Sequence, residues 1–373
     1  MIYLDYSATT PVDPNVLDYF VETSKHFFGN PNSKHLLGIE SENQIKQTSA
    51  KILSLLNMEN SEVIYTSGAT EANNLAIKGV ANKYKNQGMH LITSPYEHSS
   101  TVASFSYLTN LGFEVEVLES RNDGLIDLAE LKRKIRKDTI LVSIALINSE
   151  TGIVQPLEEI SQIVRSNPTT IFHSDMTQAI GKIHVNANLV DLMTFAAHKF
   201  YGIKGIGALI RKNTVQLEPI IHGGTSTTSV RSGTPATPLI LSLGKALECA
   251  YENFDDKFSH VVHLAEYLRN ELTHCPNVFL NSTNDSVPHI INISLITVNS
   301  IALQNFLQRR GVYVSTQSAC SSSNGYSQLI YKMTGDDLRA KSSIRISLSY
   351  LTSLQEVINF ISIFKEEVQN ASH

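Results

Sequence analysis

Short apolar runs alternate with segments of helical periodicity from about residue 50 to residue 212. Several of these runs are apolar throughout, as expected of parallel strands that are covered on both faces. Strands separated by helical segments indicate an α/β fold with a mainly parallel, doubly wound sheet. The expected strands are 62–66, 90–93, 113–118, 139–147, 169–173, 191–196 and 207–211, and the clearest helix is 71–84.

The C-terminal third has a different pattern. A long stretch of helical periodicity is followed by three apolar runs that alternate with two helical segments. We expect a smaller α+β domain built from 1–14 and 251–373, beside a large domain over 15–250. Ser353 and Glu356 predict a capping box at the start of the last helix. The expected helical segments are 239–274, 299–310 and 354–370, and the strands are 289–295, 312–315 and 344–348.

Charge and hydropathy exclude several classes of protein. The 373 residues carry a net charge of −5 and no lysine- or arginine-rich block, which argues against direct binding of nucleic acid. The longest apolar runs are of strand length, well short of the ~20 residues of a membrane span. The N-terminal segment lacks the pattern of a signal peptide. We therefore expect a cytoplasmic protein without a membrane partner.

The chain has three cysteines, Cys249, Cys275 and Cys320, so at least one thiol is unpaired within it. Cys249 lies among apolar neighbours and Cys275 precedes a proline, which suits structural residues. Cys320 lies in a run of small and polar residues, which is typical of a solvent-reaching loop. Cys320 is the expected reactive thiol.

Three polar motifs each follow a predicted strand, and each also has an ordinary structural interpretation. The turn 67–71 leads into a helix and offers backbone N–H groups to an anion, although it is equally a helix cap. Asp175, with Gln178 three residues on, could simply cap the next helix. Lys199, beside His198 in a glycine-rich loop, is placed to form a Schiff base, although most lysines are merely solvated.

The three motifs carry more information together than apart. In doubly wound sheets, ligands bind beyond the carboxyl ends of the strands, where all three motifs lie. A pyridoxal 5′-phosphate site needs a phosphate cradle at a helix N-terminus, an acid for the pyridinium nitrogen and a lysine. The sequence supplies these three groups in that order, as the motif that contains Thr70, then Asp175 and then Lys199. His98 follows the second strand and could cover the cofactor ring.

Arg345 lies within a strand pattern and needs a partner, either a substrate carboxylate held by two hydrogen bonds or a structural ion pair. A zinc site is the weaker hypothesis, because the candidate ligands include no closely spaced ligand pair and two of them lie on a helical segment. No metal site is expected. The ligands considered were His260, His263, His274 and Cys275.

The chain closely resembles the cysteine desulfurases, in the class V aminotransferase group of pyridoxal phosphate enzymes, over nearly its whole length. This resemblance implies the type I fold of the pyridoxal phosphate-dependent transferases. The individual motifs are weak, but their order is highly specific. They are 3–11 (YLDYSATTP), 28–33 (FGNPNS), 66–71 (TSGATE), 97–98 (EH), Asp175 with Gln178, 198–199 (HK), 231–234 (RSGT) and 318–320 (SAC).

The resemblance also implies roles in binding the cofactor. Lys199 would bind it as a Schiff base and later move the substrate Cα proton. Asp175 would pair with the ring nitrogen, Gln178 would bond the phenolic oxygen, and His98 would stack on the ring and assist proton transfer. The remaining cofactor-binding positions implied are Ala69, Thr70, His198 and Thr234.

For the substrate, the resemblance implies that Arg345 grips the carboxylate of L-cysteine, with Asn148 and Ser149 nearby. Cys320, as thiolate, would attack the substrate sulfur and leave alanine and an enzyme persulfide. A sulfur-acceptor protein would receive that sulfur, for iron–sulfur cluster assembly or tRNA thiolation. The segment 231–234 would reach the cofactor of a partner subunit, which implies a homodimer.

Three positions depart from the family pattern. Many relatives have serine where Ala196 stands, asparagine where Ser149 stands, and a Glu-Arg pair within 225–228. The alternatives are a selenocysteine lyase or another class V enzyme, a cysteine hydrolase, and a non-catalytic sulfur carrier. A hydrolase using Cys320 and a histidine would leave Lys199 without a function.

Overall fold

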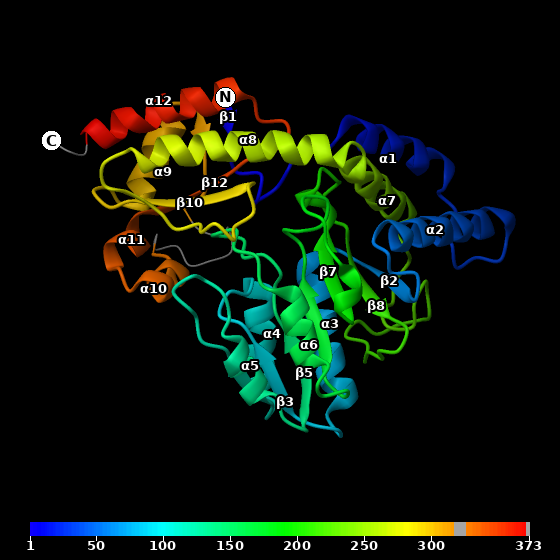
Figure 1. Cartoon of the computed structure of the whole chain (residues 1–373). Coiled ribbons are helices and arrows are strands. Elements are labelled where there is room, and N and C mark those ends of the chain that lie inside the picture. Colours follow the sequence, from blue (N-terminus) through cyan, green and yellow to red (C-terminus); the bar gives the residue numbers. More distant parts are fainter. Residues whose placement is uncertain (317–325, 371–373) are drawn as a thin grey trace.

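A seven-stranded sheet forms the centre of the larger part of the protein (Figure 1). The computed structural model describes residues 1–316 and 326–370. The strand order is β2-β8-β7-β6-β5-β3-β4, and β8 alone is antiparallel to its neighbours. The strands are β2 (Ser61–Thr66), β3 (His90–Thr93), β4 (Glu114–Val117), β5 (Thr139–Ser143), β6 (Ile171–Asp175), β7 (Leu192–Ala196) and β8 (Gly207–Lys212).

Apolar side chains project from both faces of this sheet and are buried beneath helices, which confirms the prediction of a doubly wound α/β fold. Val63 packs in a cluster with residues of α2, α6 and α7, whereas its neighbour Ile64 packs with residues of α3 and α4. Burying both faces removes far more apolar surface from water than one covered face would. The helices of this part are α1 (Pro14–His26), α2 (Leu36–Leu55), α3 (Ala69–Tyr84), α4 (Ser99–Thr109), α5 (Leu128–Lys134), α6 (Leu157–Val164) and α7 (Thr237–Tyr251).

A smaller unit packs around a separate apolar cluster, which includes Ile2 and Leu4 from the N-terminus. Its antiparallel sheet has the order β12-β10-β9, and β1 pairs with β11 in parallel. The predicted boundaries of the two domains stay a prediction. The elements are β1 (Ile2–Tyr3), α8 (Phe254–Thr273), β9 (Val278–Leu280), β10 (Ile290–Leu295), α9 (Ser300–Arg309), β11 (Val312–Tyr313), α10 (Gln328–Thr334), α11 (Asp337–Ser342), β12 (Ser343–Ser347) and α12 (Leu354–Asn370).

The long helical stretch over 239–274 forms two helices rather than one. Asn253, with φ of 49°, adopts the left-handed conformation between α7 and α8, and this breaks the backbone hydrogen-bond series. The capping box is confirmed, since the Ser353 amide donates to Glu356 Oε2 at 2.8 Å and the Glu356 amide donates to Ser353 Oγ at 3.2 Å. Among the helices described, none has the length and apolar character needed to span a membrane.

Candidate active site

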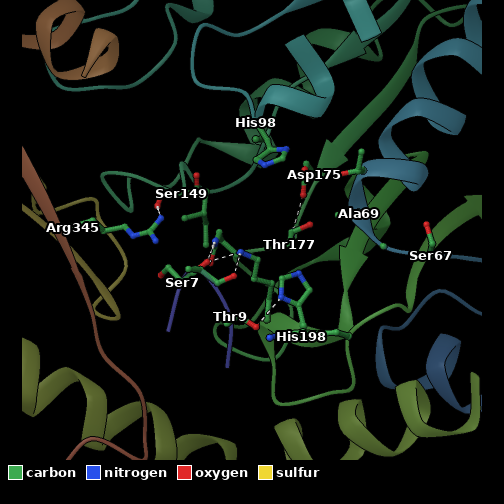
Figure 2. A pocket seen from close by; sticks show the side chains of 18 of the residues that line it. Ser7, Thr9, Ser67, Ala69, His98, Ser149, Asp175, Thr177, His198 and Arg345 are labelled. Atoms are coloured by element: carbon green, nitrogen blue, oxygen red, sulfur yellow. Dashed lines mark hydrogen bonds between the residues drawn. The ribbon is translucent and has the colours of Figure 1, made fainter. Parts of the chain in front are cut away.

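A cavity of about 470 Å³ opens at the carboxyl ends of the parallel strands, where the N-terminal segment and β12 meet the large sheet. Its volume is in the usual range for small-molecule sites. Figure 2 shows Arg345 on the side of this space away from Ala69, with His98 and His198 on two further sides. The lining residues are Ser7, Ala8, Thr9, Ser67, Gly68, Ala69, Thr70, Tyr96, His98, Ala145, Ile147, Ser149, Asp175, Thr177, Gln178, His198, Lys199, Lys204, Gly205 and Arg345.

The N-terminus of α3 faces this cavity. Gly68 occupies the N-cap position and the helix has no side-chain cap within the described residues, while Ala69 and Thr70 line the cavity directly. Glu71 is turned back to the Ser67 amide, 2.7 Å away, and to Arg231, whose Nε lies 2.8 Å from it. The first turn therefore presents N–H groups and the positive end of the helix dipole, which suits a phosphate group.

Asp175 ends β6 with its carboxylate buried at the cavity. Its Oδ1 accepts from the Thr177 amide at 2.9 Å, and its Oδ2 accepts from Asn73 Nδ2 at 2.7 Å. Within the described residues it has no ion-pair partner, so a cationic ring nitrogen would complete its surroundings. Asn73, fully buried on α3, was missed by the sequence reasoning. Asn73 could have been recognised as a candidate because it is a polar residue on an otherwise apolar face of the predicted helix.

Lys199 and His198 follow β7 in a short turn, Ala197–Lys199. The Lys199 Nζ donates to the backbone oxygens of Ser7 at 2.6 Å and Ala8 at 2.8 Å. His198 Nδ1 lies 3.2 Å from Thr9 Oγ1. Burial lowers the pKa of His198 to about 4, and nearby lysines contribute, so its ring is neutral at pH 7. The N-terminal segment thus forms one wall of the site.

His98 is the N-cap of α4, and its Nδ1 accepts from the Ser100 amide at 3.2 Å. Burial lowers the pKa of this imidazole, which keeps it neutral. Its position on the cavity wall leaves the ring available to a planar ligand, as Figure 2 shows. Ser100 also accepts from Asn73, 3.0 Å away, which connects His98 to the carboxylate of Asp175 through one polar network.

Gln178 lies three residues beyond Asp175, in a turn, and is held at both ends of its amide. Its Nε2 donates to the Ser7 backbone oxygen at 3.0 Å, and its Oε1 accepts from Lys182 Nζ at 3.0 Å. Burial lowers the pKa of Lys182 well below its ordinary value. The hydrogen bond from this half-buried lysine fixes which way the amide of Gln178 points.

Arg345, 1% exposed, lies in β12 and lines the cavity. One guanidinium nitrogen donates to Asp5 Oδ1 at 2.8 Å and the other donates to the Ser149 backbone oxygen at 2.8 Å. Its Nε has no hydrogen-bond partner in the part of the chain that the structure describes. The structural ion pair considered from the sequence is therefore present, and the same side chain also lines the cavity.

Two of the described candidate residues, Asn148 and Thr234, are not brought into this lining. The Asn148 side chain donates to the Tyr96 backbone oxygen at 3.0 Å and accepts from the Thr151 amide at 2.8 Å, so it stabilises a turn. Thr234 lines a neighbouring pocket of about 180 Å³, which shares Ser67 and Gly205 with the main cavity. Cys320 lies outside the described residues.

The other two cysteines are buried and free, and burial raises the pKa of both thiols. A raised pKa keeps a thiol protonated and unreactive at pH 7. This agrees with the structural role expected for Cys249 and Cys275.

Ser7, Ala8 and Thr9 also line the cavity. The sequence indicated these residues only as part of the N-terminal motif.

Comparisons with known proteins agree with this arrangement. The family model for class V aminotransferases matches residues 2–360. A cysteine desulfurase IscS from Buchnera aphidicola subsp. Schizaphis graminum is 41% identical over 365 residues, or 95% of this chain and 90% of the relative. A mitochondrial cysteine desulfurase from Candida albicans is 39% identical over 98% of this chain and 76% of its own length. The solved structure of a NifS-like protein superimposes with a TM-score of 0.92 at 33% identity, covering 99% of both chains.

Proposed function

The chain belongs to the class V aminotransferases and is a pyridoxal 5′-phosphate-dependent cysteine desulfurase, and on this premise we propose that the cavity at the strand ends is its active site. One observation carries the proposal. The uncapped N-terminus of α3, the buried Asp175 carboxylate and the Lys199 amine all reach the same 470 Å³ space from separate segments. The cofactor requires partners for three of its groups. The helix N-terminus suits its phosphate anion, the carboxylate suits its cationic ring nitrogen, and the amine suits its aldehyde carbonyl.

The residues present fit this cofactor. The N–H groups at Ala69 and Thr70, with the neutral His198 ring, suit the phosphate group. Asp175 lacks a positive partner among the described residues and suits the ring nitrogen. The Thr177 hydroxyl, buried on the cavity wall, has no hydrogen-bond partner within the described residues and could serve the bound molecule.

We assign the chemical steps to the residues around this space. The bound cofactor withdraws electrons from the substrate Cα. Lys199 would hold the cofactor through its amine, and the same amine would move the Cα proton of the substrate. Gln178, oriented by Ser7 and Lys182, would donate to the phenolic oxygen of the ring, and His98 would cover the ring face.

Arg345 would receive the substrate carboxylate, and its ion pair with Asp5 holds the guanidinium in position beforehand. The pairing of Arg345 with the substrate carboxylate would be geometrically specific, because a guanidinium and a carboxylate can form two parallel hydrogen bonds. Ser149, rather than its neighbour Asn148, lines the cavity and would lie beside the substrate. This assignment combines the two sequence hypotheses for Arg345.

Cys320 is the proposed sulfur acceptor within the enzyme. Its thiolate forms a bond to the sulfur of L-cysteine as the carbon–sulfur bond breaks, and a proton completes the methyl group of L-alanine. The sulfur of the substrate becomes the terminal sulfur of a persulfide, and no external oxidant is consumed. The sulfur then passes to an acceptor protein, which we propose acts in iron–sulfur cluster assembly or tRNA thiolation.

We further propose a homodimer in which 231–234 approaches the cofactor of the partner subunit. Support comes from Arg231, which is tied to Glu71 at the cofactor end of α3, and from Thr234, which lines the adjacent pocket. The cytoplasmic location stays a prediction, since the matched relatives include bacterial and mitochondrial enzymes.

Three variants test this assignment. After borohydride reduction of the holoenzyme, mass spectrometry should find the cofactor attached to Lys199, and Lys199→Ala should carry none. Cys320→Ala should still show a spectral response to L-cysteine, but without persulfide or alanine turnover. Cys275→Ala, which removes a buried thiol, should keep its turnover. Alanine production by Cys320→Ala at the wild-type rate would refute the role of this thiol.

A further inference from the structure

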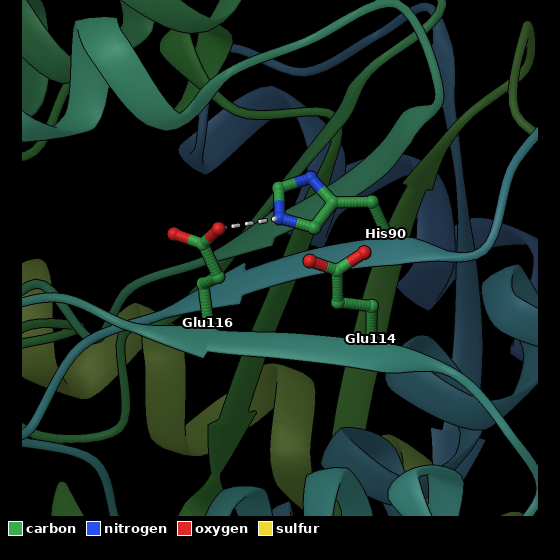
Figure 3. Close-up of side chains that lie close together, drawn as sticks. All are labelled: His90, Glu114 and Glu116. Carbon is green, nitrogen blue, oxygen red and sulfur yellow. Dashed lines mark ion pairs between the residues drawn. The ribbon is translucent and has the colours of Figure 1, made fainter.

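A histidine and two glutamates converge at the edge of the large sheet, away from the cavity. In the parallel pair β3–β4, His90 lies opposite Glu114, and Ile92 lies opposite Glu116. Because side chains alternate along a strand, Glu114 and Glu116 share one face with His90. Figure 3 shows the three side chains directed toward one another. His90 begins β3, whereas the candidate active site lies beyond the opposite ends of the strands.

The spacing of these side chains suits a metal ion. One ligand atom from each residue lies within 4.8 Å of the other two, and His90 Nε2 lies 3.6 Å from Glu116 Oε1. A tetrahedral zinc ion with bonds of about 2.1 Å separates its ligand atoms by roughly 3.4 Å. The histidine and Glu116 are therefore already near that spacing. Glu114 is exposed, and a rotation of its side chain away from one of its contacts with Arg136 would bring an oxygen to the ion.

The imidazole of His90 is fully buried, yet its Nε2 has no hydrogen-bond partner among the described residues. A buried polar atom without a hydrogen bond is costly, and Figure 3 shows this atom facing the Glu116 carboxylate, 3.6 Å away. An imidazole nitrogen in this position is a suitable zinc ligand.

The groups around these ligands resemble the outer shell of protein metal sites. His90 Nδ1 lies 2.7 Å from Thr139 Oγ1, which leaves Nε2 as the ligand nitrogen when Nδ1 carries the proton. Lys134 Nζ lies 3.1 Å from Glu116 Oε2, and Arg136 holds Glu114. Hydrogen bonds of this kind orient ligating carboxylates. Arg136 contacts both oxygens of Glu114, so it must release one of them.

We propose that His90, Glu114 and Glu116 form a zinc site that joins the edge strand β4 to β3. One imidazole with two carboxylates suits Zn²⁺ better than Ca²⁺ or Mg²⁺, which prefer oxygen ligands alone. The exposed position of Glu114 admits a water molecule as fourth ligand. The site would protect an edge strand, which otherwise has unpaired backbone groups.

Cobalt(II), a spectroscopic substitute for zinc, tests the site in the holoenzyme of Cys320→Ala, a background that removes one competing thiol. We expect one equivalent of Co²⁺ with visible ligand-field absorption that Zn²⁺ abolishes. Glu114→Gln, a change at an exposed side chain, should weaken binding at least about tenfold. His90→Gln should weaken it as much. Zn²⁺ should also raise the Tm of the parent protein but not that of Glu114→Gln.

The matched control is Glu62→Gln, since Glu62 pairs with Arg211 at the opposite edge of the same sheet. Among the described residues, Glu62 belongs to no cluster of possible metal ligands. This variant should bind Co²⁺ like its parent. Absence of Co²⁺ and Zn²⁺ binding in the parent would overturn the proposal. Binding that is unchanged in Glu114→Gln would overturn it too, because the metal would then lie elsewhere. Neither outcome depends on desulfurase activity.

Discussion

Glu97, next to His98, allows a quantitative test of the electrostatics beside the cavity. Its Oε1 accepts from the Ser94 hydroxyl at 2.5 Å and from the Ala145 amide at 2.8 Å. Its Oε2 is buried and has no hydrogen-bond partner in the described part of the chain. Burial raises the pKa of this carboxyl from 4.5 to about 8, and Asp175 contributes. Glu97 is therefore mostly protonated at pH 7.

The raised pKa makes the stability depend on pH. Glu97 stabilises the folded state most below its unfolded pKa of 4.5, and this contribution is lost as the pH rises through the folded value of about 8. At 1.36 kcal/mol per pKa unit, the loss between about pH 5 and pH 9 amounts to about 4 kcal/mol. Above pH 9 the contribution no longer changes, because Glu97 is ionised in both states.

Glu97→Gln removes this dependence, because the amide is neutral at every pH and still offers an oxygen to Ser94 and Ala145. The free energy of unfolding of the two holoenzymes is measured by urea unfolding followed by circular dichroism. The difference, variant minus wild type, should increase by about 4 kcal/mol between pH 5 and pH 9. Glu271→Gln is the control, since the hydrogen bond from Lys365 lowers the pKa of that carboxyl. It should show no such gain. A Glu97→Gln difference that stays within about 1 kcal/mol over this range would refute the reasoning.

Three further substitutions test other parts of the structure. Asp5→Asn should lower the free energy of unfolding by about 3 kcal/mol, because it leaves the buried Arg345 guanidinium unpaired; an unchanged urea midpoint would contradict this. Lys182→Met should keep the stability, since burial lowers the pKa of Lys182 and favours its neutral form, but should shift the holoenzyme absorption by releasing Gln178. Identical spectra would argue against that coupling. Ser353→Ala should cost about 1 kcal/mol by removing the capping box, and calorimetry showing no loss would disprove the cap.

Local patterns were sufficient for the α/β fold and for part of the site. Alternating apolar and helical segments predicted the central strands, and Asp175 and Lys199 were found because the carboxyl ends of parallel strands meet at one edge. The capping box at Ser353 was also visible, since its two residues are three positions apart. Each of these features depends on neighbours in the chain or on one general rule of sheet geometry.

Contacts between distant segments were decided only by the tertiary structure. The backbone oxygens of Ser7 and Ala8 accept from the Lys199 amine, more than 190 positions away in the sequence. Asn73 on α3 donates to Asp175 at the end of β6, 102 positions away. Nothing in the local sequence of either partner records such a contact, because packing of the three apolar clusters brings the segments together. Hydrophobic and helical periodicity therefore determined where the reactive groups lie along the strands. Only folding decided which backbone oxygens, carboxylates and amides surround them, since burial and long-range packing set those distances.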